Sequence, residues 1–205
     1  ISEGAFDTLR KDEGFEERVI SLHDELSYLL VEGIISERGD DDKDVDTPLG
    51  LLYRGKLRRL LRWPLAKVRS EKLLASLPSS FLQEHALLLG RLGRHEDALR
   101  ILYCDLQSLD LALAYCDARH SRERAKGGGK SIISCAYLPL VRVALESDPD
   151  TERGTRAAIQ VLALRSGSID RAAALRLLPE TVPVSAVARP FLIPALVDSE
   201  SEIRR

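Results

Sequence analysis

The chain has 205 residues, of which 44% are hydrophobic, and this is enough apolar material to bury the core of one or two domains. Its 30 basic and 32 acidic residues give a formal net charge of -2, which excludes an overall electrostatic field that would attract nucleic acid. No run of about 18 apolar residues occurs, so the sequence also excludes a membrane-spanning helix.

Residues 1–70 carry a helical pattern and no sequence motif beyond it. Apolar side chains recur there at the spacing of one helix face, which we expect to be buried: Phe15, Val19, Leu22, Leu26 and Leu30. The acidic residues 37–46 contain too little apolar surface to pack, so we expect them to form a loop. Because the chain opens on Ile1, we also expect it to be a segment of a longer protein.

Residues 51–63 form a basic amphipathic pattern. Arg54, Arg58 and Arg62 fall on one side of a helix, while Leu57, Leu60 and Leu61 face elsewhere. Such a helix can dock on an acidic partner protein or lie on an anionic membrane surface. The alternative is a helix of a repeat whose arginines are simply solvated.

The next segment has the most regular helical pattern in the chain. Its apolar positions span residues 81–92, and Gly93-Arg94 is expected to end this helix, with the glycine just past the last turn. Ser108 or Asp110 is expected to cap a following helix. Residues 121–130 contain Gly127-Gly128-Gly129, and we expect them to form a mobile loop.

Further helices are expected in the last third of the chain, separated by Asp148-Pro149-Asp150 and by Ser166-Gly167-Ser168. Residues 98–102 and 174–178 echo one another, and alternation typical of strands is absent. The sequence therefore predicts an all-α fold, an α-solenoid of antiparallel helical hairpins similar to clathrin-heavy-chain or tetratricopeptide repeats. A single globular helical bundle is the alternative at this length.

Three patterns suggestive of chemistry fail on inspection. Gly129-Lys130-Ser131 lacks the earlier glycine of a phosphate-binding loop, because Arg124 occupies that position. An EF-hand beginning at Asp42 would need a glycine and a glutamate where the chain has Thr47 and Tyr53.

Cys116 and His120 could share a helix face, but no second pair completes a zinc site. The three cysteines have no paired spacing and fit a reducing compartment better than a disulfide framework. We therefore expect no enzymatic activity, no cofactor, no metal and no small-molecule substrate.

Two stretches of residues 71–205 go beyond a generic helical pattern. They are Gly93-Arg94-His95-Glu96-Asp97-Ala98-Leu99 followed by Tyr115-Cys116, and Ala174-Leu175-Arg176-Leu177-Leu178-Pro179 followed by Phe191-Leu192. In this order they resemble the C-terminal half of the vacuolar protein sorting 39 family, which includes the TGF-beta receptor-associated protein.

The resemblance implies a cytoplasmic subunit of a HOPS or CORVET tethering complex, peripheral on endosome, lysosome or vacuole membranes. It implies a clathrin-repeat-like α-solenoid that binds another core subunit, vacuolar sorting protein 11. Such an interface relies on a few apolar and arginine anchors. The candidate anchors in this chain are Arg54, Arg58, Arg62, Arg189, Phe191 and Leu192. The alternative function is a peripheral membrane-binding module that uses the basic helix 51–63.

Overall fold

The computed structural model describes residues 13–37, 47–125, 137–147, 152–179 and 182–193, and all regular structure in these ranges is helical. The predicted all-α fold is therefore confirmed. Contacts divide the chain into two compact units, Ile1–Arg94 and His95–Arg205.

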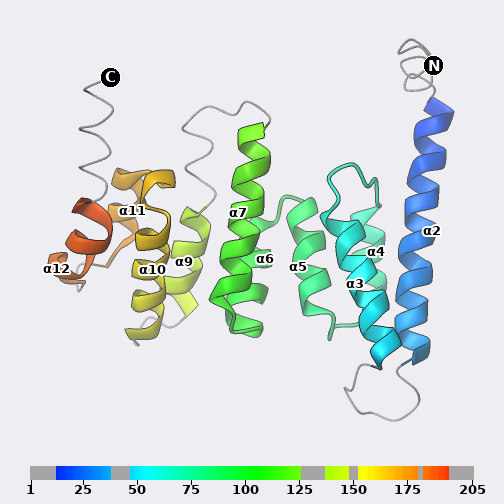
Figure 1. The fold of residues 1–205 in the computed structure, drawn as a ribbon, viewed down its shortest axis with the longest axis horizontal. Helices are drawn as coiled ribbons and strands as arrows, with labels where there is room; N and C mark the ends of the chain where they lie inside the picture. Colours follow the sequence, from blue (N-terminus) through cyan, green and yellow to red (C-terminus); the bar gives the residue numbers. More distant parts are fainter. Residues whose placement is uncertain (1–12, 38–46, 126–136, 148–151, 180–181, 194–205) are drawn as a thin grey trace. The chain divides into compact units, whose positions relative to one another are not determined.

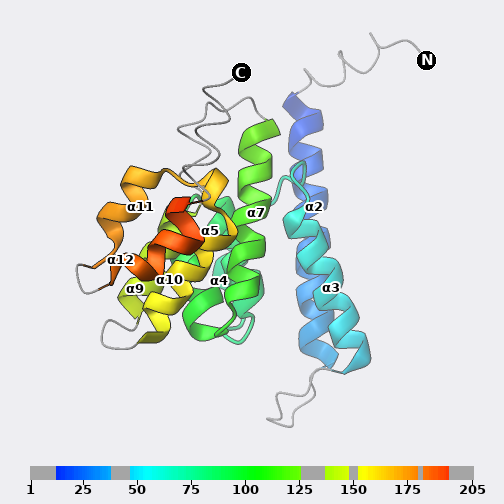
Figure 2. The same ribbon diagram turned by 60° about the vertical axis from the view of Figure 1, so that its left-hand side comes forward.

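The first unit begins with an antiparallel helical hairpin. Helix α2 (Glu13–Glu37) lies beside α3 (Pro48–Arg62), as both views of the fold show (Figures 1 and 2). The His23 and Trp63 rings meet edge to face with their centroids 5.4 Å apart at one end of this pair. Towards the other end, Gly33 lies against the Tyr53 ring, and a Cβ added to the glycine would come within 3.2 Å of it. Low residue numbers of α2 thus face high numbers of α3, which makes the two helices antiparallel.

A second, shorter hairpin stacks on the first in the same unit. It consists of α4 (Ser70–Ser76) and α5 (Leu82–Arg91). Arg54 of α3 bonds to Glu84 of α5, and Arg91 of α5 bonds to the Leu61 carbonyl of α3, two contacts that both join residues 30 positions apart. Equal separations mean that α3 and α5 run parallel, as equivalent helices of successive repeats do in a solenoid.

Leucines dominate the core between these hairpins. Buried side chains from α2, α3, α4 and α5 form one cluster, whose members include Leu30, Ile34, Leu57, Leu61, Leu73, Phe81 and Leu88. Leu57, Leu60 and Leu61, which the sequence places on a different side of the helix from the arginines, are buried here. Burying a leucine side chain contributes roughly 1.5–3 kcal/mol, so this cluster is the main force that holds the four helices together.

The second unit has the following elements in chain order: α6 (His95–Arg100), a π-helical turn η1 (Ile101–Asp105), α7 (Leu109–Ala125), α9 (Leu138–Ser147), α10 (Glu152–Leu164), a 3₁₀ turn η3 (Ser166–Ser168), α11 (Arg171–Leu177), α12 (Val184–Val187) and a π-helical turn η4 (Ala188–Leu192). Several of these helices are short: α6, α11 and α12 have 6, 7 and 4 residues. Pro139 is the second residue of α9, where proline costs no hydrogen bond.

Like helices run parallel in this unit as well. Arg142 of α9 donates to Glu96 of α6 at 2.9 Å, and Arg100 of α6 donates to Glu146 of α9 at 3.1 Å. Both contacts join residues 46 positions apart, so α6 and α9 are equivalent helices of two stacked hairpins. Alanines allow close approach in the core, where Ala98, Ala112, Ala144, Ala158 and Ala174 are all fully buried.

Two expectations about the ends and faces of helices are wrong. Residues 121–125 continue α7 instead of opening a loop, because Arg119 and Glu123 form an ion pair one turn apart that favours helix; residues 126–130 lie outside the described part of the chain. The predicted buried face of α2 is mostly exposed, and only Leu30 of that set is buried.

The reason lies in the connection between α3 and α4. His23 accepts a hydrogen bond from the backbone N–H of Lys67 at 3.2 Å, and Asp24 accepts one from that of Arg69 at 2.8 Å. Unpaired backbone groups are costly to bury, so α2 turns its polar residues toward this connection. Residues 38–46, most of the acidic loop expected at 37–46, lie outside the described residues, and Glu37 ends α2.

The sequence predicts a boundary between residues 1–70 and 71–205 because the family-like motifs lie only in the second range. The compact units divide after Arg94 instead, because α4 and α5 pack with α2 and α3. As a boundary of function, residue 70 stays a prediction.

Gly93 ends α5 as the sequence predicts. The backbone N–H of Arg94 donates to the Leu89 carbonyl at 2.9 Å, that of Gly93 donates to the Gly90 carbonyl, and Gly93 has φ = 79°. This is a Schellman motif, which requires the left-handed backbone that glycine adopts at low cost.

We expect Gly93→Ala to lower the free energy of unfolding by about 1 kcal/mol, because an L side chain disfavours positive φ while the surroundings leave it room. The matched control is Gly55→Ala, in the interior of α3, where an added Cβ meets nothing within 4 Å. That substitution should raise the free energy of unfolding by up to about 1 kcal/mol. Urea titrations of both variants check the opposite signs, and a stabilising Gly93→Ala would contradict the assignment.

Candidate partner-binding surfaces

The three arginines predicted on α3 do not share one environment. Arg54 and Arg58 both bind the carboxylate of Glu84, with nitrogen–oxygen distances of 3.2 and 3.1 Å. Glu84 is fully buried, and the Arg54 guanidinium also lies over the Phe81 ring, 4.9 Å from its centroid. The sequence did not single out Glu84, although an acidic residue on the apolar face of α5 was a signal that it needs a buried cationic partner.

Arg91 of α5 binds backbone carbonyls at and just beyond the C-terminal end of α3. Its guanidinium donates to the carbonyls of Leu61 at 3.1 Å and Trp63 at 3.3 Å, and also to that of Ala66. The last carbonyls of a helix lack partners within the helix, and a planar guanidinium can satisfy several of them at once. Arg54, Arg58 and Arg91 therefore have contacts inside the first unit, whatever they do toward a partner.

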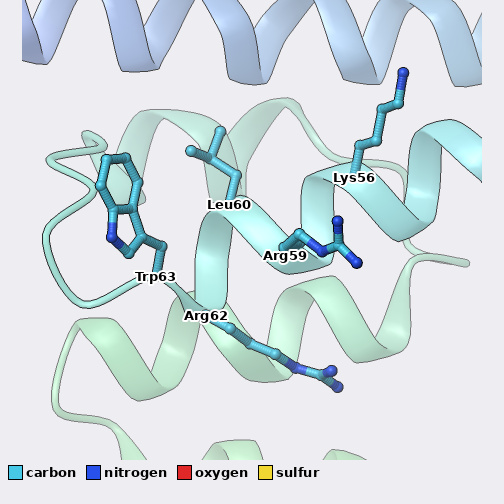
Figure 3. A pocket seen from close by; sticks show the side chains of 5 residues that line it. All are labelled: Lys56, Arg59, Leu60, Arg62 and Trp63. Carbon is cyan, nitrogen blue, oxygen red and sulfur yellow. The ribbon is translucent and has the colours of Figure 1, made fainter.

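A different face of α3 is exposed. Lys56, Arg59, Leu60, Arg62 and Trp63 line a shallow hollow of about 580 Å³ at the C-terminal part of this helix (Figure 3). Trp63 is 46% exposed, and no described residue forms an ion pair with Lys56 or Arg59. Of the predicted basic anchors, Arg62 alone lines this hollow.

An exposed apolar stripe on α2 runs along the side of this helix that meets Tyr53 of α3. Leu22, Leu26 and Leu29 are 63%, 44% and 65% exposed, and their spacing places them on one helix face. Gly33 continues that face by one turn and touches Tyr53 of α3, so the stripe follows the contact between the two helices. Leu60 and Lys56 point toward α2 from the other side (Figure 3). We name this surface the α2–α3 seam, made of Leu22, Leu26, Leu29, Lys56, Arg59, Leu60 and Trp63.

The predicted anchors near the C-terminus lie in the second unit. Phe191 is fully buried in η4, Leu192 is half-buried, and Arg189 is exposed. Only Arg189 of these three therefore presents most of its side chain to a partner. Contact of any of the six predicted anchors with a partner stays a prediction.

Two of the histidines have structural partners within the fold. His85 pairs through Nε2 with the Pro78 carbonyl at 3.1 Å. His95 pairs through Nδ1 with the Tyr115 hydroxyl at 2.7 Å and so joins the two parts of the first family-like motif. Burial and the nearby Arg119 lower the pKa of His95, and burial raises the pKa of Tyr115 to about 12. The pair is therefore neutral near pH 7 and links the start of α6 to α7.

Cys116 is buried on the apolar face of α7, as the sequence favours, and burial raises its pKa to about 12. A thiol with such a pKa is neither a nucleophile nor a ready metal ligand. Within the described ranges, no three or more His, Cys, Asp or Glu side chains are grouped so that they could hold a metal ion. No helix among the described residues is long and apolar enough to cross a membrane.

Asp117 joins three elements of the second unit. It receives two hydrogen bonds from Arg165, at 2.8 and 2.6 Å, and one from the Tyr137 hydroxyl at 2.8 Å. These bonds, those from Arg165 first, hold the pKa of the Asp117 carboxyl below its ordinary value against the opposing effect of burial.

A carboxyl with a lowered folded-state pKa stabilises the fold above its unfolded-state pKa, about 3.9, and this contribution is lost as the pH falls through the folded-state value. We expect Asp117→Asn to lower the free energy of unfolding by about 0.5–1 kcal/mol at neutral pH, since the pair is partly exposed. This difference from the original chain should shrink below about pH 4. Urea titrations across this range, with the exposed Asp105→Asn as control, test it; a difference independent of pH would contradict it.

Comparison with known proteins identifies relatives. The chain is 32% identical to the Vam6/Vps39-like protein of Homo sapiens over an alignment of 146 residues, which covers 65% of this chain and 16% of that protein. It is 30% identical to the Transforming growth factor-beta receptor-associated protein 1 of Mus musculus over 182 residues, 86% of this chain and 20% of that protein. It is 27% identical to the Vacuolar protein sorting-associated protein 39 homolog of Caenorhabditis elegans over 186 residues, 75% of this chain and 19% of that protein.

The chain thus spans a fifth or less of the length of these relatives. A match over 86% of the chain must include part of residues 1–70, because residues 71–205 are only about two thirds of it. The relationship therefore reaches beyond the motifs that carried the resemblance. Neither a protein-family model nor a solved structure matches the chain.

Proposed function

Because the chain belongs to the family of Vam6/Vps39-like proteins and Transforming growth factor-beta receptor-associated protein 1, we propose that it is a protein-binding scaffold of a membrane-tethering subunit. In this proposal it is the C-terminal module of a subunit of the HOPS or CORVET kind. It binds another core subunit, vacuolar sorting protein 11, in the cytoplasm at the surface of endosomes, lysosomes or vacuoles. The module makes and breaks no covalent bond.

One observation carries this proposal, the 30% identity to Transforming growth factor-beta receptor-associated protein 1 over 86% of the chain. The fold supports it. Stacked helical hairpins offer extended surfaces on which other proteins dock. The exposed leucines of the α2–α3 seam are the apolar surface that such docking buries.

The test is a pull-down of the chain with the C-terminal solenoid of vacuolar sorting protein 11 from the same source, at low and at high salt. We expect binding that persists at high salt, because an apolar interface is little screened. The control is the same affinity resin without the solenoid. Failure of the folded chain to bind would overturn the assignment of this partner.

The second candidate is the peripheral membrane-binding module that uses residues 51–63. It is favoured by Lys56, Arg59 and Trp63, which share an exposed face of α3, since cations and a tryptophan suit a membrane interface. It is weakened by Arg54 and Arg58, whose charges Glu84 neutralises. Flotation with vesicles that contain or lack anionic lipid tests it, and equal recovery from both would exclude it.

A further inference from the structure

The α2–α3 seam combines features that a plain solvated face lacks. Its leucines lie on one face of α2 at the 3–4 residue spacing that pairs helices, and all three are more than two fifths exposed. On the α3 side the surface is hollowed rather than convex, with Leu60 and the Trp63 indole among its walls. A hollow on one helix and an apolar stripe on its paired helix can together accommodate the protruding side chains of another helix.

The charges along the seam are arranged by side. Lys56 and Arg59 stand on the α3 edge, and neither has an ion pair among the described residues. Glu25 and Glu32 are exposed on α2 beyond the leucine stripe, where helical spacing places them on the opposite edge, and Arg18 precedes them on that edge near the start of the helix. A ligand helix that fits both edges carries carboxylates along the flank that faces α3 and none along the flank that faces these glutamates.

We propose that the α2–α3 seam is a docking groove for an amphipathic helix of a partner protein, with leucine-type side chains on one face and carboxylates along a single flank. The apolar face covers Leu22, Leu26 and Leu29, one side chain enters the hollow against Trp63, and the carboxylates meet Lys56 and Arg59. This inference rests on the proposed function, because it names the chemistry of the partner that the scaffold holds.

The probe is a synthetic helical peptide without tryptophan that carries leucines at 3–4 residue spacing and glutamates along one flank. Trp63 is the only tryptophan of the chain, so its fluorescence reports directly on the seam. We expect a blue shift of that fluorescence on binding, and an anisotropy titration of the labelled peptide gives the affinity. A matched peptide with lysines in place of the glutamates should bind about tenfold more weakly.

Two variants test the two halves of the seam. The Lys56→Glu, Arg59→Glu double variant should lose about tenfold in affinity for the glutamate peptide and gain affinity for the lysine peptide. The Leu26→Ser, Leu29→Ser double variant should lose binding of both peptides. The controls change equally exposed residues of the second unit, Arg153→Glu and Leu175→Ser, and should bind like the original chain. Circular dichroism confirms that each variant is folded.

Several outcomes would overturn the docking groove: no blue shift of Trp63, equal binding of the two peptides, or equal binding by the seam variants. Two further results would also do so, namely binding to anionic vesicles but not to the peptide, or a dimer of the chain that the leucine variant abolishes while the peptide does not bind. Failure of the proposed function looks different. The peptide would then bind at the seam, while vacuolar sorting protein 11 would not be captured at all.

Discussion

Glu84→Gln is expected to lower the free energy of unfolding of the first unit by about 3–5 kcal/mol, the cost of removing one partner from a buried ion pair. Glu84 has no exposed surface, and the Arg54 and Arg58 side chains that it binds are only 16% and 25% exposed. The amide keeps the shape of the carboxylate and removes its charge. Two guanidinium groups with limited access to water would then lose the carboxylate that both of them bind.

Trp63 fluorescence follows this unfolding in urea, because the only tryptophan of the chain lies in the first unit. The matched control is Glu96→Gln, which breaks the exposed ion pair with Arg142 and should change stability by less than about 1 kcal/mol. Replacing both Arg54 and Glu84 by methionine and glutamine should cost less than the sum of the single changes, because the two side chains interact. An effect of Glu84→Gln no larger than that of the control would contradict the buried pair.

The arginines of α3 show which features of this surface can be predicted from the sequence and which cannot. Their spacing predicts Arg54, Arg58 and Arg62 on one side of a helix, and the helix is confirmed, with the neighbouring leucines buried. The spacing could not reveal which neighbour the arginines face. That depends on α5 stacking parallel to α3 with Glu84 in register, a contact between residues 30 positions apart.

Local signals predicted local structure well. Gly93 was placed at the end of a helix because a left-handed residue needs glycine, and Ser108 caps α7 as expected by accepting a hydrogen bond from the Leu111 N–H at 3.3 Å. The wrong side of α2 was predicted as buried because an apolar stripe is normally the core face. Here two polar residues, His23 and Asp24, point inward because they accept hydrogen bonds from backbone groups of the α3–α4 connection. The apolar pattern of a single helix cannot predict contacts with a segment more than 40 residues away.

The same stripe explains why the seam was not found from the sequence. The apolar pattern predicts that Leu22 and Leu26 are buried, and buried residues are not candidates for a docking surface. Lys56 and Arg59 lie outside the row formed by Arg54, Arg58 and Arg62. They become the candidate cations for a partner because Glu84 forms ion pairs with Arg54 and Arg58. Functional surfaces of this kind depend on which apolar residues the fold leaves uncovered, and tertiary packing alone decides that.

Phe191→Ala is expected to lower the free energy of unfolding of the second unit by about 3–5 kcal/mol. The Phe191 ring is fully buried in η4, and η4 packs against α10 and α12. Removing it leaves a cavity among α10, α12 and η4, and the cost depends on how far these elements can collapse into it. Hydrogen exchange of the amides in α10 measures the loss, because the second unit has no tryptophan.

This variant also separates two roles for the predicted anchors. If Phe191 acts through the core, loss of partner binding in Phe191→Ala must coincide with loss of amide protection in α10. Arg189→Ala removes an exposed side chain two residues away and should leave that protection within about 0.5 kcal/mol of the original. Weaker partner binding by a folded Arg189→Ala variant then reports a direct contact, whereas weak binding by a folded Phe191→Ala variant would mean that the phenylalanine leaves the core to meet the partner.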